Sequence, residues 1–183
     1  MIVINLPGGE LYDEETECFI YTSPCTLRLE HSLYAISQWE AYWKVPFLDD
    51  ATQRTPEMLM DYFRCMVIDE DQDKVDEESF KAMPYETQQF IAEYMNDSQT
   101  ATTISSKKAK RGGKQVITSE LIYYWMVASE IPFECQHWHI NRLLTLIQVC
   151  GEKNNPTKMS KKDLAAQNKS LNAARRAKHN SAG

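Results

Sequence analysis

The chain has 183 residues, which is the usual size of a single compact domain with a tail. Its hydrophobic content of 43% and charged content of 25% are those of an ordinary globular protein, and its apolar runs are far shorter than a membrane span. The composition therefore excludes a transmembrane protein. The first ten residues have no base ahead of their apolar stretch, so we expect no secretory signal and a cytoplasmic location.

Charge is divided unevenly along the chain, although the net charge is only −6. Residues 1–100 carry 21 acidic and 6 basic side chains, a net charge of −15, whereas residues 101–183 carry 5 acidic and 14 basic ones, a net charge of +9. The bases of the second half gather within residues 107–114 and 153–178. Such segments bind nucleic acid or an acidic protein surface, and the acidic half of the chain itself is one such surface.

The N-terminal third predicts a small sheet followed by a helix. Residues 2–6, 18–21 and 25–29 have strand propensity and are separated by turn signals, so we expect two or three antiparallel strands. From residue 30 the apolar spacing changes to three or four, which predicts an amphipathic helix over residues 30–44 that ends before Pro46.

A second helix is predicted to begin at Pro56, with Thr55 as its N-cap, and to run to about Ile68. Residues 69–78 then hold seven acids, which we interpret as a solvated acidic loop. Their spacing lacks the central glycine and the closing glutamate of an EF-hand, so we expect no calcium site.

A third helix is predicted over residues 84–95, with Phe90, Ile91 and Tyr94 turned inward. The stretch near 97–114 has almost no large apolar side chain and ends in a cluster of bases, which predicts an exposed, mobile loop.

Two strongly apolar helices follow and are expected to form an antiparallel hairpin. The first begins at Thr118 or Ser119, either of which can cap it, and the second runs over residues 134–150 and stops at Gly151. This hairpin has the densest apolar content of the chain. We therefore expect it to be the centre of stability, with Leu144 buried in it.

The composition changes after Gly151. Residues 152–183 carry eight basic and two acidic side chains, and the stretch 164–178 has only Leu164 and Leu171 as large apolar residues. A helix of this kind is marginal by itself. The sequence thus predicts a mainly α fold: a helical domain over residues 1–151 with a small N-terminal β element, and a basic, partly disordered or helical tail over residues 152–183.

The search for chemistry finds no complete site. Cys135 and His139 lie four residues apart and would share a face of a helix, while His137 points away, so a metal ion would lack ligands. No nucleophile motif and no phosphate-binding loop is present in the sequence, and the five widely spaced cysteines suit reduced thiols. We therefore expect no catalytic, cofactor or metal site and no enzymatic activity, and we interpret the aromatic clusters as core.

Several segments carry a likeness to a known family. They are Leu27-Arg-Leu-Glu-His-Ser-Leu with Trp39-Glu, residues 117–126, residues 131–150, and the tail sequences Lys158-Met-Ser-Lys-Lys and Leu171-Asn-Ala-Ala-Arg-Arg. In these segments, which cover most of residues 25–178, the chain resembles the tail assembly chaperones of long-tailed bacteriophages. The resemblance implies a protein of the host cell cytoplasm that binds the tape measure protein and helps tail tube subunits assemble around it.

Two other functions stay open at this point. The chain is alternatively a structural tail or connector protein of the virion, or a nucleic-acid-binding regulator, although nucleic acid is disfavoured because the basic segments and the aromatic residues are separate in sequence. Self-association through the uneven charge is a further expectation. The predicted partner-binding residues are Leu164, Leu171, Arg175, Arg176, Lys107, Lys108, Lys110 and Arg111.

Overall fold

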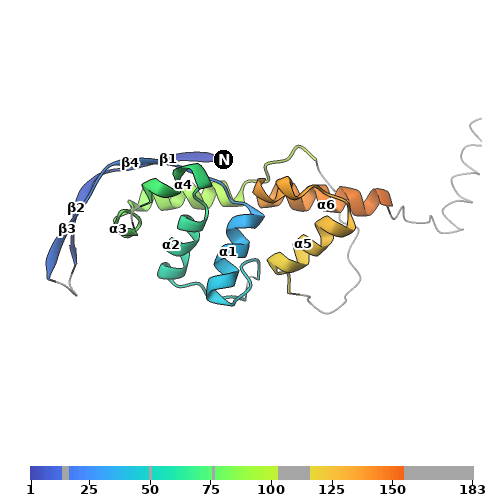
Figure 1. Ribbon diagram of the computed structural model, residues 1–183, viewed down its shortest axis with the longest axis horizontal. Coiled ribbons are helices and arrows are strands. Elements are labelled where there is room, and N and C mark those ends of the chain that lie inside the picture. Colours follow the sequence, from blue (N-terminus) through green and yellow to red (C-terminus); the bar gives the residue numbers. More distant parts are fainter. Residues whose placement is uncertain (14–16, 50, 76, 103–115, 155–183) are drawn as a thin grey trace, which may run out of the picture. The chain divides into compact units, whose positions relative to one another are not determined.

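A computed structural model describes residues 1–13, 17–49, 51–75, 77–102 and 116–154. The fold is mainly helical with a small N-terminal β element, which confirms the predicted fold class (Figure 1). By its internal contacts the chain divides into two units, residues 1–148 and 149–183. The described part of the second unit is the end of the last helix, and the loop and tail predicted near 97–114 and over 152–183 lie largely outside the described residues.

The N-terminal strands form two antiparallel pairs. Strand β1 (Ile2–Leu6) pairs with β4 (Cys25–Leu29), and β2 (Gly9–Asp13) pairs with β3 (Cys18–Thr22). The predicted strands are confirmed as β1, β3 and β4. Strand β2 was missed because its Gly-Glu-Leu-Tyr-Asp sequence has a turn former and two acids, and it is ordered by its pairing with β3.

The two strand pairs meet at a tight joint. A Cβ atom on Gly8 would lie 2.7 Å from Cδ of Pro24 and 2.9 Å from the carbonyl oxygen of Thr22, so only glycine fits there without a shift of the backbone. On one side of the joint, β1 contacts helix α4 (Tyr85–Asn96). On the other side, β3 contacts helix α3 (Glu77–Lys81).

Helix α1 (Leu33–Trp43) and helix α2 (Pro56–Cys65) begin at caps that the sequence encodes. The hydroxyl of Ser32 accepts a hydrogen bond from the Ala35 N–H at 3.1 Å, and that of Thr55 accepts one from the Met58 N–H at 3.2 Å. The second cap confirms the predicted start at Thr55. Helix α1 ends at Lys44, which has the left-handed φ of 59°.

The core is centred on α1, α2 and β4 rather than on the predicted C-terminal hairpin. The indole of Trp39 is fully buried and donates to the Met58 carbonyl at 2.8 Å, and the Phe47 and Tyr62 rings stack 3.9 Å apart. Leu143 is fully buried whereas Leu144 is only half-buried, so the prediction for Leu144 is wrong by one position. The largest fully buried side chains include Trp39, Tyr62, Phe63, Phe80, Leu6, Leu27, Leu29, Leu33 and Ile36.

Helix α5 (Ser119–Ala128) is held by a carboxylate from α1. Glu40 is buried, and its Oε2 accepts a hydrogen bond from the Ser119 N–H at 2.7 Å while its Oε1 accepts one from the Phe47 N–H at 2.7 Å. Thr118 makes no capping hydrogen bond with its side chain. The predicted local cap is thus replaced by Glu40, which anchors the positive end of the α5 dipole to α1.

The predicted second apolar helix is divided into two pieces. A 3-10 helix, η2 (Phe133–His137), is followed by extended backbone at Trp138, and helix α6 (Ile140–Asn154) begins after it. His139 forms an isolated β-bridge with Ser32, and the Ile140 N–H donates to the His31 carbonyl at 2.7 Å. These long-range bonds override the helical pattern, so Cys135 and His139 do not share a helix face. Gly151 does not end α6, which continues for another three residues.

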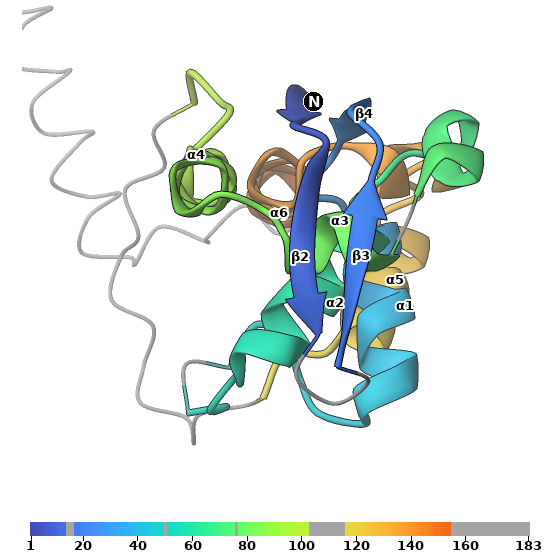
Figure 2. The same cartoon turned by 90° about the vertical axis from the view of Figure 1, so that its left-hand side faces the viewer.

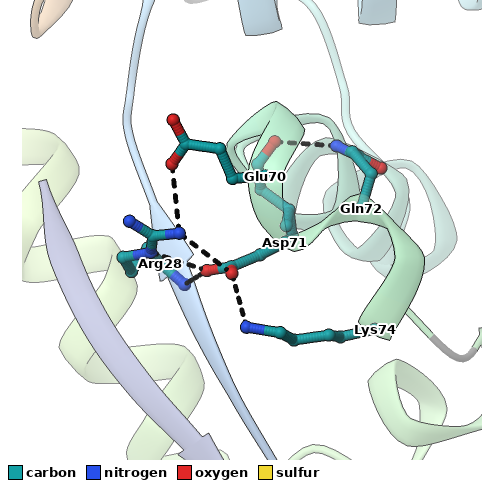
Figure 3. A network of polar contacts seen from close by, with 6 residues as sticks. Arg28, Glu70, Asp71, Gln72 and Lys74 are labelled. Carbon is teal, nitrogen blue, oxygen red and sulfur yellow. Dashed lines mark hydrogen bonds and ion pairs between the residues drawn. The ribbon is translucent and has the colours of Figure 1, made fainter.

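The predicted solvated acidic loop is also corrected. Residues Asp69–Lys74 form a 3-10 helix, η1, in which Asp71 is buried. Its carboxylate accepts from the Arg28 Nε at 2.9 Å, from the Arg28 backbone N–H at 2.9 Å and from the Lys74 Nζ at 2.6 Å (Figure 3). Asp69, Glu70 and Asp73 are exposed, and Glu70 also forms an ion pair with Arg28 at 3.1 Å, so the segment is acidic outside and is anchored to β4 through Arg28.

Candidate partner-binding site

The structure leaves the predicted partner-binding residues untested. They are Leu164, Leu171, Arg175, Arg176, Lys107, Lys108, Lys110 and Arg111, and all of them lie outside the described residues.

Within the described residues, the side of the α1–α2 pair carries a groove of about 540 Å³. Helices α1 and α2 supply its walls, and the end of η1 with the residue after it closes one side. Helices α1 and α2 contact each other, and the groove lies along this pair. Its lining consists of Gln38, Trp39, Tyr42, Trp43, Glu57, Asp61, Arg64, Cys65, Gln72 and Val75.

Three aromatic side chains form the apolar part of this α1–α2 groove. Trp39 is fixed in the core, the Trp43 ring lies 6.4 Å from it, and the Tyr42 ring meets Trp43 edge-on at 5.2 Å. Tyr42 is 74% exposed, so most of its ring area is available to a partner. The Nε1 of Trp43 is buried and has no hydrogen-bond partner among the described residues.

The rim of the groove is polar and carries both signs of charge. Glu57 lies in the first turn of α2, where its carboxylate complements the helix dipole. Asp61 and Arg64 form an ion pair at 3.4 Å with both side chains partly exposed, and such a pair contributes little to stability. An aromatic centre with a polar rim is the composition that protein-binding surfaces favour.

Cys65 lines the groove but is poorly suited to nucleophilic chemistry. Burial and the neighbouring Asp61 carboxylate raise the pKa of its thiol to about 11, although the Arg64 guanidinium acts in the opposite direction. The thiol is therefore protonated at neutral pH, and a thiol reacts as its thiolate. The groove is thus equipped for binding by shape and aromatic contact.

A second cluster of titratable side chains lies in the interior. The rings of His31 and His139 meet edge-on at 5.1 Å, the Nδ1 of His31 contacts the Tyr62 hydroxyl, and the Nε2 of His139 is 3.1 Å from the Tyr94 carbonyl. Burial, with His139 close by, lowers the pKa of His31 to about 3, and burial also lowers the pKa of His139. Both rings are neutral at pH 7 and join β4, α2 and α4 to the start of α6.

The described residues contain no group of three or more His, Cys, Asp or Glu side chains placed to hold a metal ion. Cys135 is buried in η2, His137 is exposed, and the hydrogen bonds of His139 go to the backbone of Tyr94 and Asn141. The residues that the sequence offered as incomplete metal ligands are therefore used separately. No helix of the described ranges is long and apolar enough to cross a membrane.

The aromatic residues of the groove are visible in the sequence, but the sequence predicts all of them as core. Tyr42 and Trp43 were interpreted as core together with Trp39, whereas only Trp39 is fully buried. Tyr124 of α5 and Phe90 of α4 were also expected inside and are exposed. A signal was present, because Tyr42 lies off the stripe of Leu33, Ile36, Glu40 and Trp43, but the sequence alone does not show how wide a face its neighbours cover.

Comparison of the chain with protein-family models, with curated proteins and with solved structures finds no match.

Proposed function

We propose that this protein is a tail assembly chaperone of a long-tailed bacteriophage and that it binds a helical segment of the tape measure protein in the α1–α2 groove. The observation that carries the site is the exposed ring of Tyr42 beside the half-buried Trp43, between the polar residues of α1 and α2. The phage context comes from the sequence resemblance. Action in the host cell cytoplasm, the tail tube protein as a second partner and the lack of enzymatic activity belong to the same proposal.

The groove suits an amphipathic helix better than a small ligand. A helix presents apolar anchors three and four residues apart, and a pocket of this size accepts one or two such side chains while the polar rim meets the flanks. A long helical partner needs its apolar stripe covered before assembly.

The test is co-expression with a tape measure protein, the long coiled-coil protein that the proposal names as partner, followed by pull-down through a tag on this chain. We expect a complex with the wild-type chain and at least a fivefold weaker one with Tyr42→Ala, because exposed aromatic anchors dominate such interfaces. The matched control is Tyr85→Ala, which removes an equally exposed tyrosine from α4. Equal recovery with Tyr42→Ala and with wild type would contradict the groove as the site.

The remaining functions are separated by two further measurements. Presence of the chain in purified virions would favour a structural tail or connector protein over a chaperone. Steeply salt-dependent binding to DNA would favour a nucleic-acid-binding regulator. The absence of any complex with the coiled-coil protein would contradict the chaperone proposal itself.

A further inference from the structure

The outward face of the β2–β3 hairpin carries three large aromatic side chains in solvent. Tyr12 is 50% exposed, Phe19 58% and Tyr21 74%. Together with Glu10 they form what we term the aromatic face. This surface belongs to different elements from the α1–α2 groove, so what it binds is independent of the function proposed for the groove.

The strand register places these residues on one side of the hairpin. Tyr12 lies opposite Phe19 and Glu10 lies opposite Tyr21, and the two pairs are two residues apart along each strand. The Tyr12 and Phe19 rings are 5.1 Å apart, and the Tyr21 hydroxyl donates to the Glu10 carboxylate. Thr22, on the other side, is buried, and β3 contacts α3. Figure 2 looks onto β2 and β3 with helices behind them.

The fold does not account for this composition. A two-stranded hairpin that packs one face on helices needs apolar side chains on that face and polar ones on the other. Here the solvent side holds the large rings. A cross-strand aromatic pair explains Tyr12 and Phe19 in part, but Tyr21 is the most exposed of the three and its ring is available for contact.

Charge identifies the partner that this face fits. Residues 9–22 carry five acids and no base. Nucleic acid stacks on aromatic platforms only where lysine or arginine side chains neutralise its phosphates. The hairpin has neither residue, so it repels nucleic acid. Lysine and arginine are attracted by the same acids and also bind over aromatic rings through cation–π contact.

We propose that the aromatic face of the β2–β3 hairpin binds a lysine- and arginine-rich segment of a partner protein in extended conformation. Alternate side chains of an extended segment are about 6.8 Å apart, which is the spacing between the two cross-strand pairs along the hairpin. One cation then lies over the Tyr12 and Phe19 rings. The cation two residues along meets the Glu10 carboxylate beside Tyr21.

The proposal is tested with the full-length protein and a fluorescent peptide of about ten residues in which arginine and threonine alternate, a sequence that favours the extended form. Binding is measured by fluorescence polarisation at about 0.15 M salt. We expect saturable binding to the wild-type protein and about tenfold weaker binding to the double variant Phe19→Thr with Tyr21→Thr, since one of the two rings under the first cation and the ring beside the second are lost. Glu10→Gln should weaken binding about threefold and reduce its salt dependence.

The variants separate the face from the general acidity of the protein. Threonine retains strand propensity, and Tyr21→Phe keeps a ring and should bind like wild type, so loss of the hairpin is distinguished from loss of the rings. Glu93→Gln on α4 removes an exposed acid elsewhere and should leave binding unchanged. Failure of the wild-type protein to bind the peptide, binding by the double threonine variant within about twofold of wild type, or direct binding of a fluorescent single-stranded oligonucleotide that the double variant loses would each overturn the proposal.

Discussion

Asp71 lies in a run of seven acids and is buried, because Arg28 and Lys74 approach its carboxylate from two sides (Figure 3). Arg28 is the larger influence and, with Lys74, it holds the pKa of Asp71 well below its usual range. Breaking such a pair leaves charged groups without their partner. The ion pair is therefore a structural anchor between β4 and η1.

We expect Asp71→Asn to lower the urea midpoint at pH 7. Because the pKa is lowered by folding, the stabilisation is fully present above the unfolded value of about 3.9 and is lost as the pH falls below it. The difference between wild type and Asp71→Asn should thus shrink below about pH 4. The control is Asp73→Asn, an exposed acid of the same 3-10 helix, which should leave the midpoint unchanged. A constant difference at all pH values would contradict this role.

His31 couples stability to pH in a different range. Its pKa of about 3 in the folded protein lies below the unfolded value of about 6.5, so the unfolded chain binds the proton first. As the pH is lowered from about 6.5 to about 3, protonation of His31 in the unfolded chain should lower the free energy of unfolding by up to about 1.4 kcal/mol per pH unit. His31→Gln should remove that part of the slope, measured by denaturation at several pH values between about 7 and 4. His137→Gln, at an exposed histidine, is the control, and an unchanged slope in His31→Gln would show that another group is responsible.

At the scale of elements, local signals predicted what local chemistry determines. The Thr55 cap with Pro56 located the start of α2, and Pro46 placed the end of α1 within a few residues. Long-range bonds decided the rest: Glu40 caps α5 from another helix, and the Ser32–His139 bridge divides the predicted helix at residue 138. Sequence periodicity contains no information on either partner.

The candidate site was predicted only in its composition. The cluster of Trp39, Tyr42 and Trp43 was visible in the sequence, but its division into a buried and an exposed part depends on where α2 lies. Half of the groove comes from α2 and η1, which are separate in sequence. The aromatic face of the hairpin was missed for a related reason, because Tyr12 lies on the unpredicted strand β2.

The location of the core predicts which substitution is more costly. Phe63 is fully buried on α2, so Phe63→Ala should lower the free energy of unfolding by about 3–5 kcal/mol through lost burial and a cavity. Leu144 is half-buried and Leu144→Ala should cost clearly less, whereas Leu143→Ala should cost about 2–5 kcal/mol. Urea denaturation of the three variants gives the order directly. A larger loss for Leu144→Ala than for Leu143→Ala would contradict the helix register.

At the scale of the whole molecule, the charge is divided between an acidic first part and a basic end. Deletion after Asn154 removes residues with a strong excess of bases and leaves the described ranges intact. We expect the truncated chain to keep the helical circular dichroism and melting temperature of the full chain. Unfolding on truncation would show that the removed residues belong to the core.

The same deletion, which should leave folding unchanged, should slow association with the proposed partner, the tape measure protein. For the full chain, raising salt from about 0.05 to 0.5 M should slow association by about an order of magnitude if exposed charges steer it, because the screening length shrinks from about 14 to 4 Å. The truncated chain should associate more slowly and with less dependence on salt. The association rates of both chains are measured by stopped-flow fluorescence. Equal rates for the full and the truncated chain would exclude a recruiting role for the basic end.

The joint at Gly8 divides the N-terminal ribbon into two hydrogen-bonded ladders. Pro7 and Pro24 have no N–H to donate, so the ladder of β1 and β4 stops at the Leu6–Cys25 pair and that of β2 and β3 starts afresh at Gly9 and Thr22. The β2–β3 ladder can therefore open while the β1–β4 ladder stays paired. In hydrogen exchange, amides of the hairpin then report a local opening, whereas those of β4, which is buried against the core, exchange only when the whole fold is lost. We therefore expect two neighbouring stretches of one ribbon to have separate lifetimes, and the stretch with the shorter lifetime should be the one that carries the exposed rings.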